Sequence, residues 1–229
     1  SEDQLNMLTE RFRKRMPDFV DFSQPGEKFV QHETAYKQRA LKRFQDEIGI
    51  GKLKSWLENG ETAKVMKELP KIVNMNIINF TSWRRSISGE HNDPETIVAV
   101  LNAFLEAADN TELQPENLEP IFQTIQQYGL KPSWDTLSVL LWVFNPKLHA
   151  PIKISYYRDL AEELGQQLPK GRPNAYSYCI VMDWMEKFYA ALQPLSPADW
   201  IDVQSFIWVV CPGTHKADEV ELEDSTVQI

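Results

Sequence analysis

Residue types that build recognisable catalytic or metal sites are scarce in this chain of 229 residues. Its four histidines, His32, His91, His149 and His215, show neither HxxxH nor HExxH spacing, and its two cysteines form no CxxC pair. Zinc sites need clustered ligands of these kinds, so the sequence predicts neither a metal centre nor a disulfide scaffold. Its nine glycines form no phosphate-binding GxxxxGK[ST] or GxGxxG loop. We therefore expect a non-enzymatic binding protein without a cofactor.

Long hydrophobic runs are also missing. The longest uncharged stretch near the C-terminus, residues 203–213, is far shorter than the ~20 apolar residues that a membrane span needs. No basic N-terminal segment precedes an apolar run, so the sequence predicts no secretion signal. Cys179 and Cys211 lie among apolar residues, where thiols usually pack as small hydrophobes. Two such thiols favour a reducing compartment, and we expect a cytoplasmic protein.

Charge is distributed unevenly along the chain, whose net charge is −9. Residues 1–90 contain 16 basic and 13 acidic residues, whereas residues 91–145 contain one basic residue, Lys131, and eight acidic ones. Residues 213–229 are again acidic. An acidic average argues against a non-specific nucleic-acid coat but leaves room for a local basic face.

Apolar residues recur at spacings of three and four, which predicts a mainly α, multi-helix globular bundle with at most a few short strands. Asp93 before Pro94 has the chemistry of a helix start. Segment 72–80 is open between a buried helix and an extended connector, and strands could form at 19–22, 149–154 and 205–210. We expect helices over residues 2–16, 27–48, 52–59, 62–69, 94–108, 115–128, 137–144, 155–164 and 175–192.

Composition and charge both change within residues 86–93, which suggests a domain boundary. We therefore expect an N-terminal helical subdomain over 1–88 and a C-terminal helical subdomain over 89–213. The acidic residues 214–229 are predicted to form a tail.

Four polar positions have structural explanations at this stage. Ser196 is predicted as the N-cap of a last helix, with Pro197 and Asp199 in its first turn. Asp199 and Asp202 would share a helical face, as some nucleases require, but no second acidic pair completes a two-metal site. We interpret Asp202 as a helix-surface acid. Lys37 is expected to lie off the apolar face that its helix buries.

Three basic clusters are candidate contacts for phosphates. Arg11, Arg13, Lys14 and Arg15 crowd a helix end, where cations complement the helix dipole, so a phosphate-binding role is the less favoured interpretation. In Trp83-Arg84-Arg85, the aromatic ring could stack on a base while the arginines clamp a phosphate. Equally, Trp83 could be buried with the arginines bonded to acids. The third cluster is Lys153, Arg158, Lys170 and Arg172.

Residues 196–210, SPADWIDVQSFIWVV, resemble a segment found upstream of the ATPase in many McrB-like AAA+ proteins, the motors of modification-dependent restriction systems. Trp200 stands where that family usually has Met, and residues 201–208 fit its pattern closely. Residues 137–153, LSVLLWVFNPKLHAPIK, are similar to a helix and turn of the same family.

The resemblance implies the helical region that precedes the motor, acting in antiphage defence. Our leading prediction is a DNA-recognition module with contacts from two groups of residues, which are Trp83, Arg84 and Arg85, then Lys153, Arg158, Lys170 and Arg172. The alternative is a protein-interaction scaffold that docks a partner subunit or motor through the acidic region 91–145.

Overall fold

Helices form nearly all of the regular structure of the computed structural model, which describes residues 2–73, 80–89 and 93–212. Within these ranges there is no strand, and Asp21 and Gln24 form an isolated bridge. The predicted mainly α fold is confirmed. The α-helices are α1 (Glu2–Arg15), α2 (Glu27–Phe29), α3 (Ala35–Arg43), α4 (Gly49–Glu58), α5 (Thr62–Val73), α6 (Phe80–Ile87), α7 (Pro94–Ala108), α8 (Pro115–Gln127), α9 (Trp134–Phe144), α10 (Ile154–Glu163), α11 (Ala175–Ala191) and α12 (Trp200–Val210). Two π-helical turns, η1 (Val30–Thr34) and η2 (Phe44–Ile48), and the 3-10 turn η3 (Gln193–Leu195) complete the set.

Several helix ends follow directly from local side-chain chemistry. Asp93 caps α7, accepting a hydrogen bond of 2.8 Å from the backbone N–H of Thr96. Asn174 and Ser177 cap α11 reciprocally, each side chain accepting from the other's backbone N–H. Such caps satisfy N–H groups that the first helical turn leaves without partners.

The last helix begins later than its sequence indicates. Ser196 adopts a left-handed conformation after η3, and Asp199 is the N-cap of α12, accepting from the N–H of Ile201 at 2.7 Å. The strand considered for residues 205–210 is wrong, because those residues lie within α12. This helix is buried on almost every side, so its apolar residues show no single stripe. Residues 149–153 have no regular structure, and most of segment 72–80 lies outside the described residues.

Residues 27–48 form one continuous helical segment from α2 to η2, interrupted by the two π-helical turns. Its buried stripe includes Glu33 and Lys37, whereas Tyr36 is half-buried. The expected position of Lys37 off the apolar face is therefore wrong. Because Lys37 lies three residues before Ala40 and seven before Phe44, all three fall on one side of the helix.

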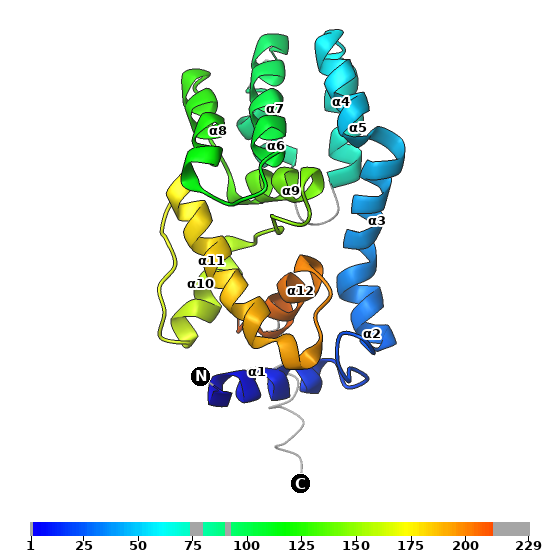
Figure 1. Ribbon diagram of the computed structural model, residues 1–229, viewed down its shortest axis with the longest axis vertical. Coiled ribbons are helices and arrows are strands. Elements are labelled where there is room, and N and C mark those ends of the chain that lie inside the picture. Colours follow the sequence, from blue (N-terminus) through cyan, green and yellow to red (C-terminus); the bar gives the residue numbers. More distant parts are fainter. Residues whose placement is uncertain (1, 74–79, 90–92, 213–229) are drawn as a thin grey trace, which may run out of the picture.

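Helix α12 lies at the centre of the lower part of the molecule, where it contacts α1, α10, α11 and η1 (Figure 1). The hairpins α4–α5 and α7–α8 project from the opposite end, and α9 lies below them (Figure 1). The predicted boundary at 86–93 falls between α6 and α7. Helices on both sides of it contribute to one hydrophobic cluster, in which the ring of Phe12 stacks on that of Phe206 at 4.8 Å.

The first basic cluster binds the end of α12. Arg11 donates to the carbonyl of Val210 at 2.8 Å and pairs with Glu163, and Arg15 donates to the carbonyl of Cys211 at 3.3 Å. Carbonyls at a helix C-terminus lack intrahelical donors and attract cations. The two arginines thus serve the dipole of α12, which lies far along the chain from their own helix.

None of the described helices combines the length and the hydropathy that crossing a membrane requires. The predicted tail at 214–229 lies outside the described residues.

Candidate functional site

Trp83, the proposed base-stacking residue, belongs to the core. Its side chain on α6 is 1 % exposed, and its indole Nε1 has no acceptor among the described residues. The stacking role is therefore not available to it in this structure, because burial among apolar side chains keeps the ring from the surface. Its neighbour Arg84 is half-buried, and Arg85 is exposed.

The two predicted basic groups meet at one short segment, residues 131–135. At one end, the N–H of Lys131 donates to the carbonyl of Arg85 at 3.1 Å, and the hydroxyl of Ser86 donates to the carbonyl of Lys131 at 3.1 Å. At the other end, the indole N–H of Trp134 donates to the carbonyl of Gly171 at 3.1 Å. Contacts across 37 and 45 positions of the sequence thus meet around the start of α9.

Arg158 and Lys153 fix the second group in place. The Arg158 guanidinium donates to the carbonyl of Pro169 at 2.8 Å and to that of Gly171 at 3.1 Å. The Lys153 ammonium pairs with Asp135 at 3.0 Å, whereas Lys131, Lys170 and Arg172 are exposed. We call the residues around segment 131–135 the basic strip, which comprises Arg84, Arg85, Lys131, Lys153, Arg158, Lys170 and Arg172.

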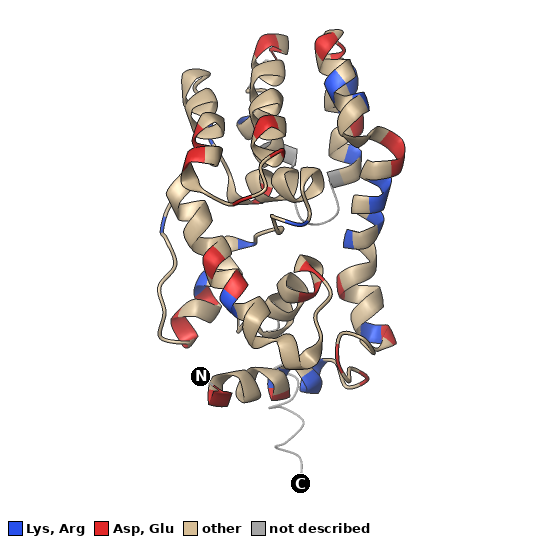
Figure 2. Ribbon diagram, in the orientation of Figure 1, with Lys and Arg blue, Asp and Glu red and all other residues tan. Residues whose placement is uncertain are grey.

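Helices α7 and α8 present the opposite charge. Residues 94–127 contain no Lys or Arg, and Figure 2 shows acidic residues at both ends of this hairpin. Glu95, Glu106, Asp109 and Glu116 are all exposed. Lys54 of α4 pairs with Asp109 at 3.1 Å, which joins the two projecting hairpins.

A cluster of ionisable side chains is buried between η1, α3 and α12. The Lys37 ammonium is 1 % exposed, donates to the hydroxyl of Ser205 at 2.8 Å and lies 3.7 Å from the Glu33 carboxylate. Asp202 is 9 % exposed and accepts from the N–H of Ala198 at 2.8 Å. We call Glu33, Lys37, Asp202 and Ser205 the buried polar cluster. The prediction that Asp202 is a surface acid is wrong.

Burial changes the proton affinities of these groups. It raises the pKa of Glu33 to about 7, although the nearby Lys37 ammonium lowers that value in part. Burial lowers the pKa of Lys37 to about 8, against the attraction of Glu33, and raises the pKa of Asp202 to about 6. In each case loss of hydration is the largest cause and disfavours the charged form, and for Asp202 the neighbouring Asp199 charge adds to the rise in pKa. Ionisable groups with such shifts beside a pocket are candidates for a functional site.

A pocket of about 390 Å³ opens beside this cluster, and we call it the η1–α12 pocket. Gln204 is 4 % exposed, and its Oε1 has no hydrogen-bond donor among the described residues. A buried carbonyl without a donor is costly and marks the position as unusual. The lining residues are Gln31, His32, Glu33, Tyr36, Pro151, Lys153, Gln204 and Trp208.

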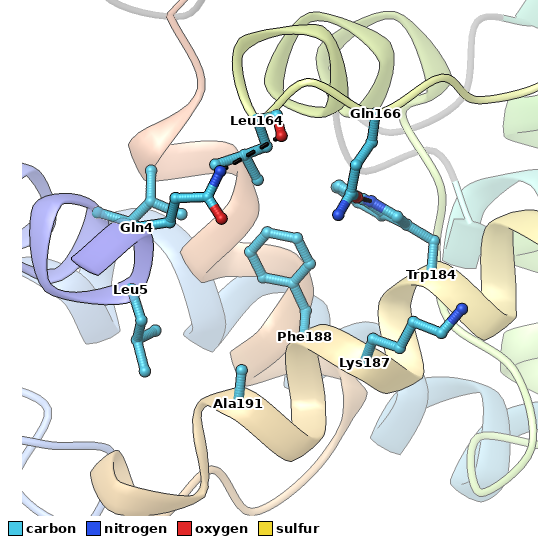
Figure 3. Close-up of a pocket in the computed structure, with 9 residues that line it drawn as sticks. Gln4, Leu5, Leu164, Gln166, Trp184, Lys187, Phe188 and Ala191 are labelled. Carbon is cyan, nitrogen blue, oxygen red and sulfur yellow. Dashed lines mark hydrogen bonds between the residues drawn. The ribbon is translucent and has the colours of Figure 1, made fainter. Parts of the chain in front are cut away.

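A second and smaller pocket, of about 180 Å³, lies between α1 and α11, and we call it the α1–α11 pocket (Figure 3). Here the amides are engaged. Gln4 donates to the carbonyl of Leu164 at 3.3 Å, and Gln166 accepts from the indole N–H of Trp184 at 2.6 Å. Figure 3 shows the ring of Phe188 pointing up between these two amide side chains.

His149 is buried, and it is not part of a metal site among the described residues. Burial lowers the pKa of His149 to about 3, and its Nδ1 lies 3.2 Å from the hydroxyl of Tyr178. Within residues 2–73, 80–89 and 93–212, no three His, Cys, Asp or Glu side chains are grouped as metal ligands.

Sequence reasoning missed the buried polar cluster, although Asp202 and Ser205 lie within residues 196–210, which the sequence analysis singled out. Comparisons with family models, with curated proteins and with solved structures each found no match.

Proposed function

We propose that this chain is a non-enzymatic DNA-recognition module that binds the phosphate backbone through the basic strip. The observation that carries the proposal is the set of hydrogen bonds around residues 131–135. They bring Arg85 and Lys131 to one end of this segment and the loop with Lys170 and Arg172 to the other. Clustered lysines and arginines supply most of the affinity of proteins for DNA, because phosphate binding releases condensed counterions. Such contacts position a protein on the duplex without reading its bases.

Arg158 has a positioning role in this proposal. Its guanidinium is occupied by the carbonyls of Pro169 and Gly171, so it fixes the loop that presents Lys170 and Arg172. The resemblance of residues 196–210 to McrB-like proteins supports a setting in a restriction or antiphage defence system.

The test is fluorescence anisotropy with plain and cytosine-modified duplexes at several salt concentrations. We expect the double variant Arg85→Ala with Lys131→Ala to weaken binding and to reduce the salt slope by about two, one for each phosphate contact. The double variant Lys170→Ala with Arg172→Ala changes the other end of the basic strip and should have a similar effect.

The matched control is Lys42→Ala with Lys187→Ala, which removes two exposed charges from α3 and α11. Its net charge equals that of each strip variant, so an equal loss of affinity in all three would show a non-specific charge effect and refute the proposal. Failure of the unmodified chain to bind either duplex at low salt would also refute it.

The acidic face of α7–α8 supports a second candidate function, a scaffold that docks a basic surface of a partner subunit or motor. Four carboxylates of this face are exposed, and Asp109 is the one that pairs with Lys54 among the described residues. Charge complementarity of this kind accelerates association and selects partners. The test is light scattering after size-exclusion chromatography of the chain mixed with candidate partner proteins encoded in the same operon. Association that survives Glu106→Gln with Glu116→Gln would contradict a role for this face.

A further inference from the structure

We infer that the η1–α12 pocket binds a small organic cation, a primary ammonium or guanidinium ion. The inference rests on Glu33, Tyr36, Gln204 and Trp208, which lie outside the basic strip, although Lys153 of the strip also lines the pocket.

Glu33 supplies the acceptor for such a cation. Its carboxylate lines the pocket, and its neighbour Lys37 donates its 2.8 Å hydrogen bond to Ser205 while remaining 3.7 Å from Glu33. A carboxylate offers about four acceptor positions. The distant lysine leaves acceptor capacity on Glu33 that a ligand with N–H donors can use.

Two aromatic side chains suit the same charge. Tyr36 and Trp208 both line the pocket, and the Lys37 ammonium already lies 5.1 Å from the centroid of the Tyr36 ring. Aromatic faces attract ammonium and guanidinium ions, and the attraction strengthens where water is excluded. The surroundings of Tyr36 thus already accommodate one cation.

Gln204 adds a hydrogen-bonding group that the protein itself does not satisfy. Gln204 lines the pocket, and its Oε1 is buried without a donor among the described residues. If the amide turns toward the pocket, a ligand that donates hydrogen bonds removes the cost of this unpaired carbonyl. Binding therefore relieves a deficiency of the unliganded fold.

The cations around the pocket are largely engaged elsewhere. Lys153 pairs with Asp135 at 3.0 Å, and Lys37 donates a hydrogen bond to Ser205. The Lys37 ammonium also attracts the carboxylate of Asp202. His32 is exposed at the rim. Of the charged lining residues, Lys153 is thus compensated by Asp135, whereas Glu33 retains acceptor capacity. This balance favours a positively charged ligand over an anion.

Isothermal titration calorimetry of the whole chain with agmatine, which carries an ammonium and a guanidinium, is the test. Pentanol and pentanoate serve as neutral and anionic comparisons. We expect saturable binding of agmatine only, at least tenfold weakened by Glu33→Gln and by Trp208→Leu. Lys187 lines the α1–α11 pocket, so the variant Lys187→Gln should bind agmatine as the unaltered chain does.

A second measurement separates binding from folding. The indole N–H resonance of Trp208 should shift on titration with agmatine in the unaltered chain, while that of Trp184 should not. No saturable binding, equal binding of pentanol, or a weakening by Lys187→Gln as large as that by Glu33→Gln would each overturn the inference. Agmatine binding with only the Trp184 resonance shifted would also overturn it, because the ligand would then occupy the other pocket.

Discussion

The η1–α12 and α1–α11 pockets use similar residues in opposite ways. In the α1–α11 pocket, the amide of Gln166 satisfies the indole N–H of Trp184. In the η1–α12 pocket, the amide oxygen of Gln204 lacks a donor within the described part of the chain, and Glu33 and Lys37 are buried with altered proton affinities. The first pocket is a space between partners that already satisfy one another. The second contains buried polar groups with unused hydrogen-bonding capacity or shifted pKa values, which is typical of sites that bind ligands or catalyse reactions.

The largest difference should come from the two lysines beside these pockets. Lys37→Met removes one partner of a buried pair and should lower the free energy of unfolding by about 3 kcal/mol at pH 7.5, because Glu33 and the hydroxyl of Ser205 both lose their charged partner. Lys187→Met breaks an exposed pair with Asp183 and should cost at most about 0.5 kcal/mol. Urea denaturation measures both values.

The double variant Lys37→Met with Glu33→Gln provides the control for that experiment. It removes both charges, so most of the lost stability should return. Equal destabilisation by the single and the double variant would mean that packing around Lys37, rather than charge, determines the effect.

The pH dependence of stability sharpens the comparison next. Burial raises the pKa of Glu33 from 4.5 to about 7, so folding favours its protonated form. Stability should therefore fall as pH rises from 4.5 to about 7, by at most about 3 kcal/mol for this group, and then level off with respect to it. Glu33→Gln should remove this part of the decrease between pH 5 and pH 7.5. Identical pH profiles for the variant and the unaltered chain would contradict the assignment.

The smallest predicted effects have opposite signs in the two pockets. Gln204→Leu replaces a buried carbonyl to which no described residue donates and should stabilise the fold by roughly 1 kcal/mol. Gln166→Leu leaves the indole N–H of Trp184 without its acceptor and should destabilise the fold by about 1 to 2 kcal/mol. Thermal denaturation of both variants gives the signs. Destabilisation by both would show that the two amides are equivalent.

Local chemistry predicts much of this fold, because helix caps and apolar spacing act over a few residues. Asp93 before Pro94 correctly indicated the start of α7. The apolar spacing around Ala40 and Phe44 also indicated that Lys37 is buried. A strict count of helical spacing places it on the same side as these two residues.

The partners of the buried residues were beyond reach of the sequence. Lys37 meets Ser205 across 168 positions, and no short-range pattern encodes that contact. The burial of Trp83 was left open for the same reason, since a tryptophan beside two arginines suits either a core or a surface. The basic strip likewise depends on Trp134 reaching Gly171 across 37 positions.

The arginines of α1 at the end of α12 have a consequence for how the chain folds as it is made. Arg11 reaches Val210 across 199 positions, and the Phe12 ring stacks on Phe206. Contacts of such long range form late, because the intervening chain must first be synthesised and its loop closed. We expect α1 to remain without its packing partner on the ribosome until residues 200–211 have emerged. Assembly of this core should therefore wait until α12 has been synthesised.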